Sequence, residues 1–112
     1  MLYYSTMSKN RRTYTLDLSI RVNETLVTEV IIDSHVDKHK DHVTDELILS
    51  LVKLLDGRIY SPAKVQGGFS YFVSRVLYNE RVYRLVWLQQ EEQFYIGVVT
   101  AFNDKGAEHD IP

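Results

Sequence analysis

The second half of the chain contains three consecutive runs of β-branched and aromatic residues, separated by two short polar turns. The runs are FSYFVSRVLY (residues 69–78), RVYRLVWLQ (81–89) and QFYIGVVTAF (93–102). Such runs, bounded by turn residues, are typical of neighbouring strands in an antiparallel meander. They constrain the fold more strongly than any other part of this 112-residue chain.

A hairpin is predicted at the start of the chain. Residues 13–22, TYTLDLSIRV, alternate between apolar and polar side chains, which is the pattern of a strand with one buried face. Asn23-Glu24 follows as a short turn, and residues 25–33, TLVTEVIID, form a second run rich in β-branched residues.

A helix is predicted over about residues 44–56. Thr44 is suited to the N-cap position, and acidic residues occupy the first turn, where the helix dipole favours them. Gly57 is suited to the left-handed position after the helix. An apolar stripe at helical spacing is formed by Leu47, Ile48, Leu51, Val52 and Leu55. A second, short helix is expected just before this one, over residues 35–42.

These elements predict a single α+β domain covering residues 1–112. The expected order is β-β-α-β-β-β, with one antiparallel sheet and the main helix packed on one of its faces. Residues 58–68, which contain Pro62, Gly67 and Gly68, are expected to form a loop. Flexible ends are expected over residues 1–12 and 103–112.

The composition restricts the function classes that we considered. The net charge of −2 argues against a protein whose whole surface grips nucleic acid, and no DNA binding is predicted. The absence of cysteine excludes disulfides and agrees with a cytoplasmic location, and the absence of a long apolar run predicts no membrane contact. No cofactor is predicted. Charge is uneven, however, because residues 53–84 contain six basic and two acidic side chains.

The segment DSHVDKHKDH (residues 33–42) contains three of the four histidines. On one helix, His35, His39 and His42 would share a face, as metal ligands must. The segment is very polar and lacks a known zinc pattern, so a metal site is the weakest of three interpretations and no residue is assigned as a metal ligand. Two other interpretations remain open: a solvated connector, or histidines that act on a phosphate or a proton.

Two arginines occur within the apolar pattern of the predicted meander. Arg75 and Arg84 are in register with apolar residues of their strands, and Thr100 is similarly placed on the last strand. A cation among apolar neighbours is costly unless it is paired or reaches water, so both could be ordinary rim residues. Alternatively the three could line a phosphate-binding concavity, because arginine suits phosphate oxygens.

Other residue types in the same region suit contacts with RNA. Lys64 and Arg81 belong to the basic segment, and the ring of Tyr83 could stack on a base. The eight tyrosines of the chain also make good strand and core residues, which is the structural alternative for most of them.

The runs HVTDELILSLVKLLDG and SYFVSRVLYNERVYRLVWLQQEEQFYIGVVTAF together resemble the compact toxins of the RelE-like kind. These belong to the small bacterial ribonucleases related in fold to barnase and to the tRNA-cutting colicins. The resemblance lies in the order of a helix and three meander strands, over about residues 33–103. It differs in charge, because RelE-like toxins are strongly basic.

The resemblance implies a toxin-type, metal-independent endoribonuclease that binds RNA and is neutralised by a cognate inhibitor protein. One of the histidines His35, His39 and His42 would then transfer protons. Arg75, Arg84 and Thr100 would lie around the phosphate. The alternative is a non-enzymatic protein-interaction module, such as an inhibitor, an antitoxin or an adaptor. Such a module would use a sheet edge or an aromatic face, and its net acidity would suit a basic partner.

Overall fold

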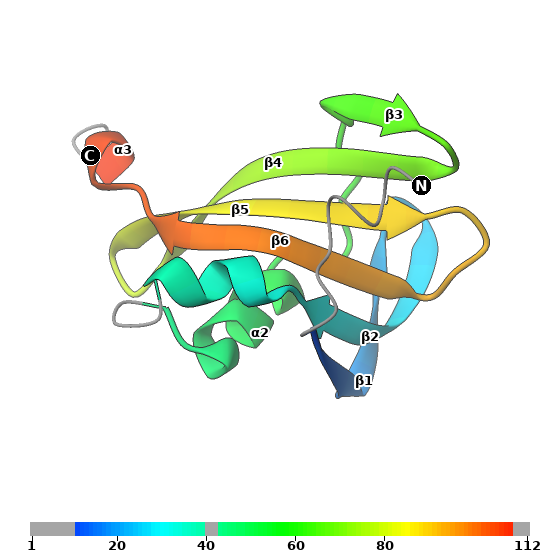
Figure 1. The fold of residues 1–112 in the computed structure, drawn as a ribbon, viewed down its shortest axis with the longest axis horizontal. Coiled ribbons are helices and arrows are strands. Elements are labelled where there is room, and N and C mark those ends of the chain that lie inside the picture. The colour runs from blue at the N-terminus through cyan, green and yellow to red at the C-terminus, as the bar shows by residue number, and fades with distance from the viewer. Residues whose placement is uncertain (1–10, 40–42, 109–112) are drawn as a thin grey trace.

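The computed structural model describes residues 11–39 and 43–108, and one six-stranded sheet dominates it (Figure 1). The order across the sheet is β1-β2-β6-β5-β4-β3. All neighbouring strands are antiparallel except β2 and β6, which run parallel. The strands are β1 (Arg12–Val22), β2 (Thr25–Ile32), β3 (Lys64–Gln66), β4 (Phe69–Tyr78), β5 (Arg81–Gln90) and β6 (Tyr95–Asn103).

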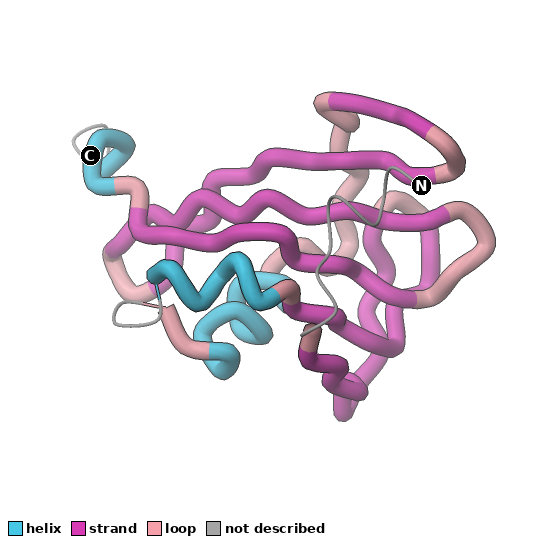
Figure 2. The backbone as a smooth tube through the Cα atoms, in the orientation of Figure 1, coloured by secondary structure: helices cyan, strands magenta, loops and turns pink. Residues whose placement is uncertain are grey.

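The sheet curls into a half-barrel, and two helical segments lie together below β6 in the view of Figure 2. They are η1 (Ser34–His39), a 3-10 helix, and α2 (Asp45–Lys53). A further short helix, α3 (Lys105–Glu108), follows β6. Within the described ranges, no helix has the length and apolar character needed to cross a membrane.

The main core lies between the hollow side of the sheet and α2. Helix α2 buries Ile48, Leu51 and Val52 completely, as expected from its apolar stripe. From the sheet, Trp87 is fully buried and stacks on Phe72 with ring centroids 4.2 Å apart. Successive side chains of a strand point to opposite faces, so the alternate residues of β4, β5 and β6 point away from α2.

This mostly β architecture shows that the predicted α+β fold, with an antiparallel sheet in β-β-α-β-β-β order, is wrong. The sheet is mixed because β2 pairs with β6 in parallel, from Glu29 opposite Tyr95 to Ile32 opposite Val98. It has a sixth strand because β3 forms inside the expected loop at 58–68. The helix is also shorter than predicted and ends at Lys53, three residues before Asp56.

Several local predictions are confirmed. The side chain of Thr44 caps α2 by accepting a hydrogen bond from the Leu47 backbone N–H. The three runs of the meander form β4, β5 and β6. The first part of the short helix expected over 35–42 is present as the 3-10 helix η1, and residues 40–42 lie outside the described residues.

The predicted flexible ends are shorter than expected. Strand β1 already begins at Arg12, inside the segment expected to be a flexible end. Likewise, β6 and α3 extend into the expected C-terminal tail.

Candidate functional site

The sheet face that points away from α2 exposes apolar and basic side chains next to one another. We call this surface, on β4, β5 and β6, the outer face. On β4 it presents Val73 and Leu77, whose exposed fractions are 54% and 58%. Val86 on β5 lies directly opposite Val73, and Phe102 on β6 lies in the neighbouring row. Large apolar side chains grouped in this way are the usual mark of a contact surface.

The structure brings Arg75 and Arg84 together, as the predicted phosphate site requires. They face each other across β4 and β5, and like charges in directly opposed positions repel. One carboxylate offsets this repulsion, since Asp104 Oδ2 lies 3.4 Å from Arg75 Nε and 3.3 Å from an Arg84 terminal nitrogen. The Arg84 guanidinium also lies over the Phe102 ring, 5.8 Å from its centroid. The pair is therefore partly neutralised within the protein.

Thr100 and Lys64 share the outer face with the arginines. Thr100 is opposite Val86, so it lies one row along the sheet from Arg84, about 7 Å away along the strand. Lys64 is exposed on β3, opposite Tyr71. Three strands thus contribute Arg75, Arg84 and Thr100 to one surface, with Lys64 at its margin.

The other two predicted RNA contacts are placed differently. Arg81 is exposed at the start of β5, next to the turn that joins it to β4. Tyr83 is only 7% exposed and belongs to the core between the sheet and α2. Its position on β5 has the opposite phase to that of Arg84, and its burial argues against stacking on a base.

The predicted catalytic histidines His35 and His39 lie on η1. Their side chains, and all of His42, lie outside the described part of the chain. η1 packs beside β6, and its Asp37 side chain forms an ion pair with Arg12 of β1. In the order of strands across the sheet, β1 is at the end far from β4. Among the described side chains, no group of three His, Asp or Glu could hold a metal ion.

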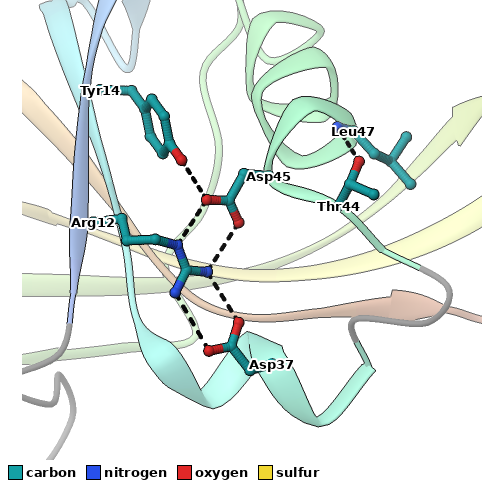
Figure 3. Close-up of polar contacts among 6 residues, drawn as sticks. All are labelled: Arg12, Tyr14, Asp37, Thr44, Asp45 and Leu47. Atoms are coloured by element: carbon teal, nitrogen blue, oxygen red, sulfur yellow. Dashed lines mark hydrogen bonds and ion pairs between the residues drawn. The ribbon is translucent and has the colours of Figure 1, made fainter.

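A second polar cluster joins β1 to both helical segments (Figure 3). Asp45, in the first turn of α2, accepts two hydrogen bonds from Arg12, at 2.7 and 2.9 Å, and a third from the Tyr14 hydroxyl. The remaining donors of Arg12 reach Asp37 on η1, at 3.0 and 3.3 Å. We call these four residues the Arg12 cluster.

The chemistry of the Arg12 cluster is that of a structural tie. The hydrogen bonds from Arg12, and then that from Tyr14, hold the pKa of Asp45 below its usual value, although partial burial opposes this. The hydrogen bond to Asp45 is also the largest cause of the raised pKa values of Arg12 and Tyr14. A saturated, low-pKa carboxylate is a poor general base, so the cluster fixes the fold and carries no catalytic assignment.

Two cavities flank the segment between α2 and β3, each with a volume of about 330 Å³. The first lies beside the second half of β4 and is lined by Leu54, Leu55, Arg58, Tyr60, Ser74, Arg75, Val76 and Leu77. We call it the β4 cavity. The second lies near the turns and is lined by Asn23, Thr25, Ile59, Tyr60, Pro62, Ser70, Phe72 and residues 89–92.

The sequence prediction overlooked the exposed apolar residues and the β4 cavity. One signal was present, because FSYFVSRVLY is apolar or aromatic in both strand phases instead of in one. A strand of this kind is either buried on both faces or leaves one apolar face open to a partner.

Searches with the whole chain against protein-family models, curated proteins and solved structures found no match.

Proposed function

We propose that this protein is a protein-interaction module whose contact surface is the outer face. The observation that supports the proposal is the group of exposed apolar side chains on this face, led by Val73 and Leu77. Contiguous exposed apolar residues rimmed by polar ones are characteristic of surfaces that bind other proteins.

The charge of this surface suggests the character of the partner. The outer face carries three basic side chains, those of Arg75, Arg84 and Lys64. Among the described acidic side chains, Asp104 pairs with both arginines. Electrostatic complementarity therefore favours a partner surface that is acidic. The net charge of −2 led us to expect a basic partner. We now propose an acidic one, because the charge of the contact surface and not the net charge of the chain decides which partner is attracted.

We expect Val86→Asp combined with Phe102→Ala to abolish the contact with a partner. The few hot-spot residues near the centre of an interface each contribute about 2 kcal/mol or more, and a carboxylate placed there must also be desolvated. The measurement is size-exclusion chromatography of the chain co-expressed with the products of its neighbouring genes, followed by calorimetric titration of any complex.

The matched control for this experiment is Leu18→Asp. Leu18 is 81% exposed on β1, at the opposite end of the sheet order from β4. It introduces the same charge at an exposed leucine, so it should leave the complex intact. A complex that survives the outer-face double variant, or that Leu18→Asp disrupts equally, would contradict the proposal.

A metal-independent endoribonuclease is the second candidate function. The observation that favours it is the pair of arginines on one exposed surface with Thr100 in the next row. Arginines can stabilise the charge that develops on a phosphate during RNA cleavage. His39 would act as the base in this proposal, and a cognate inhibitor would bind over the same surface.

We expect Arg84→Ala or His39→Ala to relieve growth arrest on induction if the ribonuclease proposal holds. Loss of one electrostatic contact to the reacting phosphate typically lowers the rate by about 10²- to 10³-fold. RNA cleavage by purified protein in the presence of a chelator provides the direct measurement. Arg21→Ala, an exposed arginine on β1, is the control. Wild-type protein that neither arrests growth nor cleaves RNA would exclude this function.

A further inference from the structure

Within residues 11–39 and 43–108, one edge of β4 has no paired strand over its second half, and we call it the uncovered edge. β3 covers only residues 69–71, where Lys64 pairs with Tyr71 and Gln66 with Phe69. Figure 1 shows the rest of β4 extending beyond β3; β5 lies along its other edge, and no described strand lies along the edge on the β3 side. An uncovered edge is a template on which another extended chain can pair.

The hydrogen-bonding direction of this edge follows from its last pairing with the segment before β3. The carbonyl of Tyr71 accepts a hydrogen bond of 2.7 Å from the N–H of Ala63. Backbone groups of alternate residues point to the same side of a strand. Since the pairing of β4 with β5 has no bulge, Val73, Arg75 and Leu77 present their N–H and C=O groups at the uncovered edge.

The β4 cavity lies beside this edge on the core side of the sheet. Ser74 and Val76 point to that side, and the Ser74 hydroxyl accepts a hydrogen bond of 3.0 Å from Trp87 Nε1. Leu54 and Tyr60 contribute apolar surface from the segment after α2. In antiparallel pairing, opposed side chains lie on the same face. A strand added to β4 would therefore direct the residues opposite Ser74 and Val76 into the cavity.

The charges around the uncovered edge of β4 indicate which kind of chain can pair with it. Arg58 and Arg75 line the β4 cavity, and none of its described lining residues is acidic. A second copy of this chain is disfavoured, because any two-fold pairing centred on residues 74–76 brings two Arg75 side chains close together. An acidic extended segment has the complementary charge, and a carboxylate opposite Arg75 would lie on the outer face.

We infer that the edge Val73–Leu77 binds an extended segment of a partner protein as an added antiparallel strand. The segment has the core apolar–acidic–apolar, with the acidic residue opposite Arg75 and the two apolar residues in the β4 cavity. Main-chain hydrogen bonds supply the affinity in this mode, and alternate side-chain pockets supply the specificity. This inference rests on the proposed function, for which it names the binding mode and the partner chemistry.

The probe for the test is the peptide acetyl-Gly-Ser-Val-Glu-Val-Ser-Gly-amide, titrated to about 5 mM, above the roughly millimolar dissociation constants of weak specific contacts. We expect saturable shifts in the amide NMR signals of Val73, Arg75 and Leu77, and slower hydrogen exchange there. Trp87, the one tryptophan in the chain, should report filling of the cavity by a change in its emission.

A charge exchange tests the register. The same peptide with Lys in place of Glu should bind at least about tenfold more weakly, which corresponds to about 1.4 kcal/mol. Arg75→Glu should reverse this preference, whereas Arg81→Glu, an exposed arginine on the same hairpin, should leave it unchanged. N-methylation of the peptide should prevent binding only at the amides that face β4.

Three results would overturn the inference: no shifts at the highest peptide concentration, shifts confined to Val86 and Phe102, or a dimer that pairs through β4. The proposed function is separable from these results. If the outer-face double variant still abolishes the partner complex while the edge amides do not respond to the peptide, the interaction module stands without strand addition. If both experiments fail, both ideas are wrong.

Discussion

Replacing Trp87 with alanine is expected to lower the free energy of unfolding by about 3–5 kcal/mol. The indole is fully buried, stacks on Phe72 and meets the edge of Tyr60 with ring centroids 5.4 Å apart. Its removal leaves a cavity that these rings cannot fill, and it leaves the Ser74 hydroxyl without its donor. Because domains of this size have a total stability of about 5–15 kcal/mol, this loss should remove a large fraction of the free energy of unfolding.

Urea denaturation followed by far-ultraviolet circular dichroism measures this loss, since the substitution removes the fluorescent reporter. Trp87→Phe is the matched control, because it retains an aromatic ring and should cost less than the alanine variant. A loss below about 1 kcal/mol for Trp87→Ala would contradict the central position that we assign to this residue.

Replacing Asp45 with asparagine is expected to lower the free energy of unfolding at neutral pH by about 1–3 kcal/mol. The carboxylate accepts hydrogen bonds from Arg12 and Tyr14, and its side chain is only 25% exposed. It also lies in the first turn of α2, where the helix dipole favours a negative charge. An amide leaves the Arg12 guanidinium less well paired.

The same variant should change the acid limb of the stability curve. Because the hydrogen bonds from Arg12, then Tyr14, lower the pKa of Asp45 in the folded state, its carboxylate stabilises the fold above the unfolded pKa of about 3.9. That contribution is lost as the pH falls through the lower, folded pKa. Asp45→Asn should therefore show a smaller loss of stability between neutral and acidic pH than the wild type.

Asp37→Asn is the control within the Arg12 cluster. Its side chain is 47% exposed, and an exposed ion pair typically contributes below about 1 kcal/mol. Urea denaturation at several acidic pH values measures the free energy of unfolding of both variants. We expect the larger loss for Asp45→Asn. Equal losses for the two variants would show that the contact of Arg12 with Asp45 contributes no more to stability than its contact with Asp37.

Local structure was predictable because it depends on short-range physics. The alternation of residues 13–22 identified β1, and Thr44 identified the start of α2 through its cap. Strand β3 could also have been recognised, since Gly67-Gly68 is a strong hairpin signal. Both glycines adopt positive φ angles, 59° and 82°, as such a turn requires.

Long-range pairing was not predictable from these patterns. The parallel contact of β2 with β6 joins residues more than sixty positions apart, and the alternation within a strand does not encode its neighbour. One hint was the consecutive run Val30, Ile31 and Ile32, since strands buried on both faces lose the alternation of polar residues. Val30 and Ile32 are fully buried, and Ile31 packs with Leu88 on the opposite side of the sheet.

The candidate site was predicted in part for a similar reason. The phase of β5 correctly placed Arg84 with Val86, but both faces of this strand are apolar, so its sequence did not show which face was the core. Tyr83 was consequently assigned to the exposed surface. The uncovered edge of β4 depends on where β3 ends, which is a tertiary property and not a feature of β4 itself.

The parallel pairing of β2 with β6 also sets an order for biosynthesis. While the ribosome is still adding the meander, residues 29–32 have been made but their partners, residues 95–98, have not. Until residues 95–98 have been made, the nascent β1–β2 hairpin therefore has one apolar strand whose edge is unpaired. Contacts of such high sequence separation slow folding, and an exposed strand edge invites misassociation. The waiting edge of β2 should thus make chaperone binding to the nascent chain favourable during synthesis.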